Sequence, residues 1–153
     1  MDLILWRHAE AFEGCEVEDD LERALTPKGE RQAARMAQWL QRHLPASARV
    51  LVSPARRAQQ TAAALERKFK TSPALAPSEG VEALLGAVRW PDAREPVLVV
   101  GHQPTLGLAA GYLLSGQPLS WSIRKGGVWW LRSRERDGAF QVILHAVTGP
   151  DLL

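Results

Sequence analysis

The size and composition of the chain favour a small globular protein and give no sign of a nucleic-acid or membrane partner. Its 153 residues, 46% hydrophobic and 24% charged, predict a single domain spanning residues 1–153. The net charge is only +2 although the pI is near 9.0, and no apolar run approaches the roughly 20 residues of a membrane span. Cys15 is the only cysteine, which excludes an internal disulfide, and no basic region of a signal peptide precedes the first apolar run, so we expect a cytoplasmic protein.

Three short, unbroken apolar runs predict buried parallel strands. They cover 3–6, 50–52 and 97–100. An uninterrupted apolar strand is expected where both faces of a parallel sheet are covered. The segments between these runs have helical patterns, which supply such a cover.

Four helices are predicted. Thr26 is the expected N-cap of the first, Pro27 its first residue, and Pro45 ends it. Ser53-Pro54 is expected to begin the second helix in the same way. The predicted helices cover 27–44, 54–69, 81–88 and about 105–116, and the segment 70–80, rich in Pro and Ser, is expected to be a surface loop.

The last third of the chain has the pattern of an antiparallel hairpin. The apolar run 128–131 follows two glycines, Asp137-Gly138 is a turn signal, and 141–147 is strand-like. We therefore predict an α/β fold: a three-layer α/β/α domain with a mostly parallel central sheet and a C-terminal antiparallel hairpin at its edge.

Polar residues suited to an anion follow all three predicted parallel strands. Arg7 and His8 follow the first, and His102 follows the third. The second is followed by Ser53 and by a helix that carries Arg57, whose side chain leans back toward the helix N-terminus. Ligands of open parallel sheets bind at the carboxyl ends of the strands, and guanidinium groups match phosphate oxygens. Arg7, His8, Arg57 and His102 are therefore expected to form one phosphoryl pocket.

Other charged and titratable residues have simpler interpretations. Arg56, taken alone, is expected to be a solvated charge. His43, near a helix end, and His145, inside the C-terminal strand, are expected to be structural. His8 and Glu10 could face the same side of an extended segment, but no third ligand spacing supports a metal site, and we expect neither metal nor cofactor.

Four ordered blocks of sequence resemble the histidine phosphatase superfamily, which is phosphoglycerate mutase-like. They are WRHAEA, LTPKGERQA, LVSPARRAQQTA and VLVVGHQPTLG, and together they span residues 3 to about 107. The small size, the LAPS at 75–78 and the C-terminal KGGVWWL look most like the SixA-type phosphohistidine phosphatase branch. The resemblance aligns Arg57, and not Arg56, with the phosphate-binding arginine of the family.

The resemblance implies a mechanism for the four pocket residues. His8 would be the nucleophile that forms a phosphohistidine intermediate, with its other ring nitrogen fixed by a backbone carbonyl. Arg7, Arg57 and His102 would bind the phosphoryl oxygens and offset transition-state charge without a metal. The implied activity is hydrolysis of phosphohistidine on a protein partner, either a phosphotransfer domain or a carrier protein.

The general acid of larger superfamily members has no clear counterpart here. Glu79 and Glu82 lie in the corresponding region but outside the family pattern, and both are expected to be exposed. A serine or sugar alkoxide needs a proton to leave, whereas phosphohistidine can leave as neutral imidazole. A pocket poor in acids therefore favours cleavage of a P–N bond over a P–O bond.

The segment 10–22 is rich in carboxylates. Its acids are Glu10, Glu13, Glu16, Glu18, Asp19, Asp20 and Glu22. They are interpreted as a solvated loop, or alternatively as a rim that disfavours highly anionic ligands. Arg23 fits the SixA-like pattern of an arginine shortly before Leu-Thr. The alternative functions are a small-molecule phosphomonoesterase on the same scaffold and a phosphohistidine- or anion-binding module without turnover.

Overall fold

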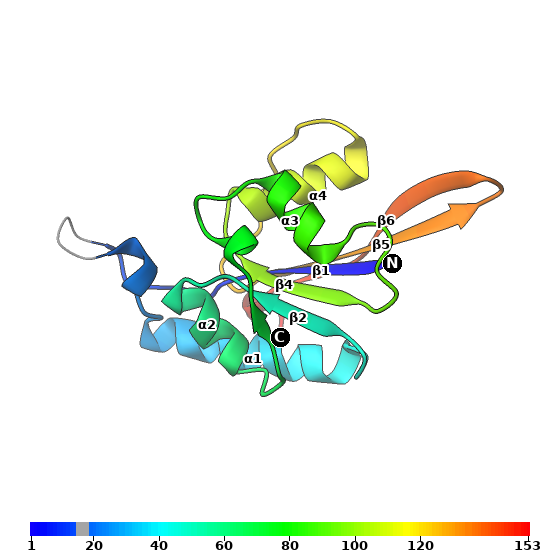
Figure 1. Cartoon of the computed structure of the whole chain (residues 1–153). Helices are drawn as coiled ribbons and strands as arrows, with labels where there is room; N and C mark the ends of the chain where they lie inside the picture. The colour runs from blue at the N-terminus through cyan, green and yellow to red at the C-terminus, as the bar shows by residue number, and fades with distance from the viewer. Residues whose placement is uncertain (15–18) are drawn as a thin grey trace.

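Six strands form one mixed sheet in the computed structural model, which describes residues 1–14 and 19–153 (Figure 1). The strand order is β3-β2-β4-β1-β5-β6. The strands are β1 (Asp2–Arg7), β2 (Arg49–Val52), β3 (Lys70–Thr71), β4 (Val97–Gly101), β5 (Val128–Arg136) and β6 (Ala139–Thr148). Strands β1 to β4 run parallel and β5 and β6 are antiparallel, so the predicted hairpin at the sheet edge is confirmed.

Helices cover both faces of the sheet. Figure 1 shows α1 and α2 on one face and α3 and α4 on the other. The helices are α1 (Pro27–His43), α2 (Arg56–Ala63), α3 (Val81–Val88) and α4 (Thr105–Ser115). The predicted three-layer α/β/α architecture is thus confirmed. None of the helices within residues 1–14 and 19–153 has the length and apolar character needed to cross a membrane.

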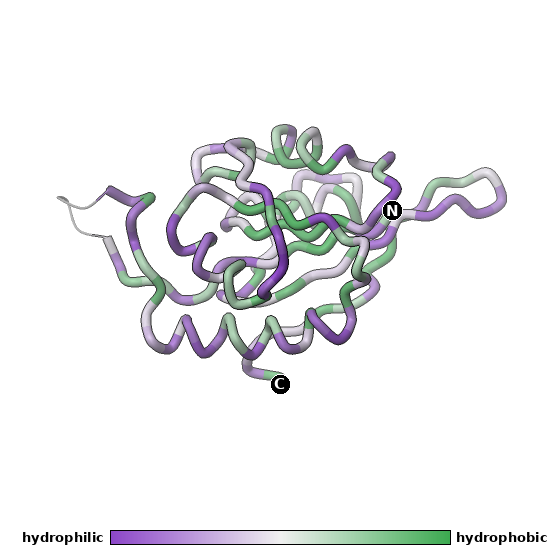
Figure 2. The backbone as a smooth tube through the Cα atoms, turned by 60° about the horizontal axis from the view of Figure 1, so that its bottom comes forward, coloured by the Kyte–Doolittle hydropathy of each residue, from purple (hydrophilic) through white to green (hydrophobic). Residues whose placement is uncertain are grey.

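The two larger hydrophobic clusters of the described core lie on opposite faces of the sheet. Successive side chains of β1 point to opposite faces, so Trp6 packs in the cluster with Leu40 of α1, and Leu5 packs in the cluster with Leu106 of α4. Figure 2 shows the resulting hydrophobic strands at the centre of the molecule and a mainly hydrophilic outer face on α1. The uninterrupted apolar strands therefore reflect burial on both faces.

The ends of three helices follow local sequence signals. Thr26 caps α1, because its Oγ1 accepts a hydrogen bond from Gly29 N at 3.0 Å. Helix α3 has the predicted bounds. Helix α4 begins just after Pro104 and ends at Ser115, before Gly116, which has a positive φ.

Two predictions from local patterns are wrong. The second helix was expected over 54–69, but α2 begins at Arg56, because residues 53–55 form the turn out of β2, and it ends at Ala63, before a left-handed residue at Glu66. The segment 70–80 is not only a surface loop. It contains the short edge strand β3 and a 3₁₀ helix, η2 (Pro73–Leu75), which buries Leu75.

Candidate active site

The carboxyl ends of the three central parallel strands bring four polar residues together. Arg7 of β1 lies beside Gly101 of β4, and the next residues, His8 and His102, leave the sheet side by side. Ser53 N donates to Val100 O at 3.0 Å, which keeps the end of β2 in the same register. The sequence-predicted arrangement at this edge of the sheet therefore follows from strand pairing.

The ring of His8 is buried and is held in one tautomer. Its Nδ1 lies 2.7 Å from the backbone oxygen of Ala9. Because a carbonyl oxygen can only accept, Nδ1 carries the proton and Nε2 carries a lone pair in the neutral ring. Burial, together with the nearby charges of Arg57 and Arg7, lowers the pKa of His8 from 6.5 to about 4, against the effect of the Ala9 hydrogen bond. His8 is therefore a neutral imidazole near pH 7.

A buried hydroxyl links the segment of His8 to helix α2. Ala9 N donates to Thr61 Oγ1 at 3.1 Å, and Thr61 Oγ1 donates to Arg57 O at 2.7 Å. Thr61 follows Arg57 by one helical turn, so the two residues lie on the same face of α2. This chain of bonds ties the backbone beside His8 to the residue that carries the guanidinium.

His102 lies against His8. The two ring centroids are 5.1 Å apart with an interplanar angle of 54°. Nε2 of His102 is 2.7 Å from Ser53 Oγ, whereas Nδ1 is buried and has no hydrogen-bond partner among the described residues. Burial lowers the pKa of His102 to about 3, with a further contribution from His8. If Ser53 Oγ donates to Nε2, the neutral His102 ring carries its proton on Nδ1, which is then a donor without a protein partner among the described residues.

The two arginines are bound in different ways. Arg57 is 3% exposed, and Arg56 is exposed, as expected from the sequence. The Arg57 guanidinium donates from Nη1 to Asp20 O at 2.7 Å and from Nη2 to Asp20 Oδ2 at 3.1 Å. Arg7 Nη1 donates to Ile123 O at 2.9 Å, which leaves part of its guanidinium for other partners.

Asp20 is a site residue that sequence reasoning missed, because it was grouped with the solvated acids. It lies in the 3₁₀ helix η1 (Asp20–Glu22) and also accepts from Arg23 Nε at 3.0 Å. Burial alone would raise the pKa of Asp20, but the hydrogen bonds and charges of Arg23 and Arg57 hold it below its ordinary value. Asp20 therefore places a carboxylate on the predicted phosphate-binding arginine.

Most of the other acids named in the sequence analysis are exposed or lie outside the described residues. Glu13, Glu22, Glu79 and Glu82 are exposed, and Glu16 and Glu18 lie outside the described residues together with Cys15. Glu10 accepts a hydrogen bond from Thr26 Oγ1 at 2.7 Å. In the part of the chain that the structure describes, no group of three or more His, Cys, Asp or Glu is placed to hold a metal ion.

The remaining histidines lie beside aromatic rings away from this edge. His43 contacts Trp39 with ring centroids 4.6 Å apart, and His145 contacts Trp130 at 5.3 Å. Arg7, His8, Arg57 and His102 thus form one group at the carboxyl ends of the parallel strands, which we call the histidine–arginine cluster.

Comparison with known proteins agrees with this geometry. Residues 3–79 match the family described as histidine phosphatase superfamily (branch 1). An uncharacterized protein of Picosynechococcus sp. is 35% identical over 155 residues, covering 95% of this chain and 90% of that protein.

Solved structures show the same fold over nearly the whole chain. A SixA from Nakamurella multipartitia, assigned as a phosphohistidine phosphatase, has a TM-score of 0.79 and 31% identity, covering 97% of this chain and 95% of its own. The protein histidine phosphatase SixA complexed with tungstate has a TM-score of 0.76 and 25% identity, covering 99% of both chains. The chain therefore belongs to branch 1 of the histidine phosphatase superfamily and is of the SixA type. Both comparisons support a phosphatase.

Proposed function

We propose that the protein is a metal-independent phosphatase that hydrolyses phosphohistidine on a protein substrate through a phosphohistidine intermediate on His8. The observation that carries the proposal is the hydrogen bond between His8 Nδ1 and Ala9 O, which leaves a neutral Nε2 as the nucleophile beside two arginines and a second imidazole. The activities named for the similar SixA proteins support the same substrate class.

In the first step, His8 Nε2 attacks phosphorus in line and forms a new N–P bond. The N–P bond of the substrate breaks, and the electron pair goes to the departing imidazole, whose other nitrogen already carries a proton. In the second step, water attacks the phosphorus of the intermediate and forms a P–O bond. The bond between His8 Nε2 and phosphorus breaks, its electron pair returns to Nε2, and inorganic phosphate leaves with the oxygen and protons of that water, which regenerates neutral His8. Neither step needs a strong general acid, which fits the exposed positions of Glu79 and Glu82.

Arg7, Arg57 and His102 take the role of binding the phosphoryl oxygens. The two guanidinium groups carry positive charge and His102 supplies hydrogen-bond capacity, and groups that are positioned before the reaction stabilise a transition state most effectively. Tungstate is a tetrahedral oxyanion, and its presence in a SixA structure supports an oxyanion site in this fold. A phosphoryl oxygen that binds at Arg57 Nη1 or Nη2 would replace part of the contact with Asp20.

The partner in this proposal is a cytoplasmic protein that carries phosphohistidine, either a phosphotransfer domain or a carrier protein. It is neither a nucleic acid nor a membrane surface. A partner of this kind presents the reactive phosphoryl group on a folded surface, so the phosphatase needs an accessible cluster and a surface that recognises what surrounds the phosphohistidine.

Rapid-quench measurement with a ³²P-labelled phosphohistidine protein tests the proposal. Wild type is expected to form an alkali-stable, acid-labile phosphoenzyme, and His8→Asn is expected to form none and to release no phosphate. A peptide with phosphoserine in place of phosphohistidine should be hydrolysed much more slowly than the same peptide with phosphohistidine. Equal rates on the two substrates would support a general phosphomonoesterase, and binding without turnover would support a non-catalytic module.

A further inference from the structure

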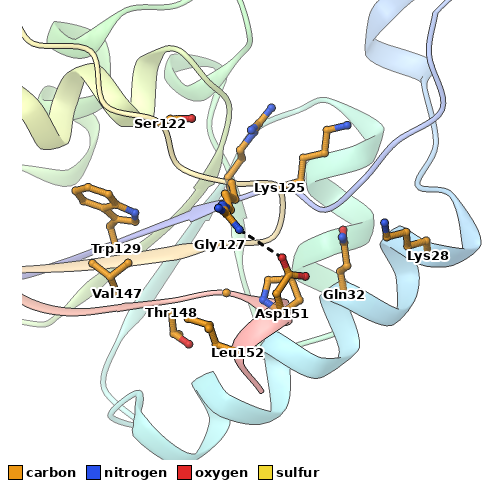
Figure 3. A pocket seen from close by; sticks show the side chains of 14 residues that line it. Lys28, Gln32, Ser122, Lys125, Gly127, Trp129, Val147, Thr148, Asp151 and Leu152 are labelled. Atoms are coloured by element: carbon orange, nitrogen blue, oxygen red, sulfur yellow. Dashed lines mark ion pairs between the residues drawn. The ribbon is translucent and has the colours of Figure 1, made fainter.

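A groove with cationic and apolar parts lies beside the histidine–arginine cluster (Figure 3). It has a volume of about 620 Å³, and Arg7 belongs to its lining whereas His8, Arg57 and His102 do not. Its walls come from the start of α1, the segment before β5, the end of β6 and the 3₁₀ helix η3 (Pro150–Leu152). The groove therefore begins at the cluster and extends away from it.

The cations of the groove outnumber its acids. Lys28, Arg124 and Lys125 are exposed on its rim, and Asp151 is the one carboxylate in its described lining. Asp151 Oδ2 lies 3.6 Å from Arg124 Nη1 and forms an ion pair with it. Within residues 1–14 and 19–153, neither Lys28 nor Lys125 takes part in an ion pair, so their charges are free to attract an anionic ligand.

The other part of the groove is apolar. Figure 3 shows Trp129 and Val147 at the end opposite Lys28, with Leu152 below. Val147 is 47% exposed and Leu152 is 75% exposed. A ligand that fills the whole groove must therefore combine negative charge with apolar side chains, which is a property of an amphipathic acidic peptide segment and not of a small polar anion.

The rim is held rigidly to the end of β1. Gly126 N donates to His8 O at 3.1 Å, and Arg7 N donates to Gly127 O at 3.0 Å. Trp6 Nε1 donates to Gly126 O at 3.1 Å. Lys125 precedes these glycines directly, so its backbone is held close to the segment that carries His8.

We propose that this groove docks an acidic, amphipathic segment of the partner protein, next to the phosphohistidine that His8 attacks. The inference rests on the proposed function and adds to it a preference for partners with carboxylates and apolar residues beside the modified histidine. Lys28 and Lys125 supply the charge attraction, and Trp129 and Val147 supply the apolar contact.

Peptide binding tests the groove without relying on turnover. The probes are two short fluorescein-labelled peptides without phosphate, one alternating Glu and Leu and the other alternating Gln and Leu. Wild type should bind the Glu peptide about five- to tenfold more tightly at low salt, and the difference should disappear at 1 M salt, where the Debye length is about 3 Å. Equal binding of both peptides at low salt would overturn the proposal.

Paired lysine variants locate the binding surface. In K28A/K125A the preference for the Glu peptide should fall toward one, and in K28E/K125E it should reverse toward a Lys–Leu peptide. K68A/K70A removes two exposed lysines beside and within the distant edge strand β3 and should keep the wild-type preference. An equal loss of preference in K68A/K70A, or equal affinity of wild type for a single-stranded oligonucleotide, would show unspecific charge attraction and overturn the proposal.

Hydrolysis separates this inference from the proposed function. The same peptides carrying phosphohistidine should show a higher kcat/KM when their flanks are acidic, and the difference should fall in K28A/K125A. Hydrolysis at equal kcat/KM for both flanks would reject the groove and leave the phosphatase assignment standing. Selective binding of the acidic peptide without hydrolysis of either would keep the groove and reject the proposed phosphohistidine activity.

Discussion

Asp20 holds the Arg57 guanidinium through two hydrogen bonds, one to its backbone oxygen and one to its carboxylate. A phosphoryl oxygen that binds at Nη1 or Nη2 would compete with Asp20 for Arg57. The Asp20 side chain is 58% exposed, which limits the strength of the ion pair because water screens it. The contact can therefore open at small cost when an oxyanion enters.

The first prediction concerns this competition. Asp20→Asn keeps the backbone contact and removes the negative charge, so the affinity for orthovanadate should rise about two- to fivefold, as expected for a partly exposed ion pair. Isothermal titration calorimetry measures the change, and Glu22→Gln, which removes an exposed acid of the same 3₁₀ helix, is the matched control. Weaker vanadate binding in Asp20→Asn would mean that Asp20 orients Arg57 and does not compete with the ligand.

Thr61 carries a second residue-scale prediction. Its buried hydroxyl accepts from Ala9 N and donates to Arg57 O, so Thr61→Val leaves a buried N–H without a partner. We expect the free energy of unfolding to fall by about 1–3 kcal/mol and kcat to fall more than KM changes, since His8 loses its backbone support.

Thr61→Ser is the matched variant because it keeps the hydroxyl. Urea unfolding and steady-state kinetics should place it near wild type in both stability and kcat. If Thr61→Val retained full kcat after a measured loss of stability, the Thr61 hydroxyl would support folding alone and not the position of His8.

At the scale of elements, the site depends on how closely α1 approaches the segment after β1. Gly29 lies in the first turn of α1, and a Cβ at this position would stand 1.9 Å from Glu10 O, which is a backbone atom and cannot rotate away. Glu10 N is in turn bound to the Gln32 side chain at 2.9 Å. The absence of a side chain at Gly29 therefore lets α1 support the segment that follows His8.

Gly29→Ala is expected to destabilise the protein and lower its activity, because α1 must move away from Glu10. Steric insertion into a packed region costs about 1–3 kcal/mol, measurable by thermal or urea unfolding. Gly86→Ala in α3 is the control, since a Cβ there meets no atom within 4 Å, and alanine in a helix should stabilise by about 0.5–1 kcal/mol. A similar change in the free energy of unfolding of both variants would mean that α1 does not need a glycine where it approaches Glu10.

Elements whose signals are local could be predicted from the sequence. Thr26-Pro27 marks the start of α1, Gly116 marks the end of α4, and Asp137-Gly138 marks the turn of the hairpin. The end of α2 at Ala63 could not be predicted, because no Gly or Pro follows it to mark the left-handed residue at Glu66. The strand β3 could not be predicted either, because it has only two residues and forms through pairing with β2. A pattern so short carries no periodicity.

The contacts of the candidate site likewise include some that the sequence predicts and some that it does not. Arg7, His8 and His102 follow apolar strands, and strands of one parallel sheet end at one edge, so their proximity could be inferred before the structure. The contact of Asp20 with Arg57 joins positions 37 residues apart through side-chain geometry, and no spacing in the sequence encodes it. The pairing of Ser53 with His102 likewise depends on the exact end of β2.

At the scale of the whole molecule, the fold separates a buried reaction centre from an exposed recognition surface. The strand ends bury the two imidazoles, and the groove beside Arg7 leaves lysines and apolar side chains open to solvent. Burial keeps His8 uncharged for attack, and it also makes the folded state bind fewer protons than the unfolded chain. The same burial that favours catalysis therefore makes stability depend on pH.

The sign of this dependence follows from the pKa values of the two imidazoles. The pKa is about 4 for His8 and about 3 for His102 in the folded state, whereas both have the ordinary value of 6.5 when unfolded. Well above pH 6.5 both imidazole rings are neutral in the folded and in the unfolded state. As the pH falls from 6.5 toward 4, the unfolded chain takes up protons that the folded protein does not, so the free energy of unfolding decreases. Asp2 and Asp20 have pKa values below the ordinary 3.8 in the folded state. Their contribution to the free energy of unfolding is therefore lost mainly below pH 3.8, outside this range.

We therefore expect the free energy of unfolding to fall on the order of 3 kcal/mol between pH 7 and pH 5, measured by urea unfolding at each pH. His8→Gln and His102→Gln should each reduce this fall, because each removes one group that protonates only in the unfolded chain. His43→Gln, which replaces an exposed histidine outside the histidine–arginine cluster, is the control for the loss of a histidine side chain. If all three variants retained the wild-type fall, its cause would lie outside the two buried rings, and His8 would not be held neutral by burial.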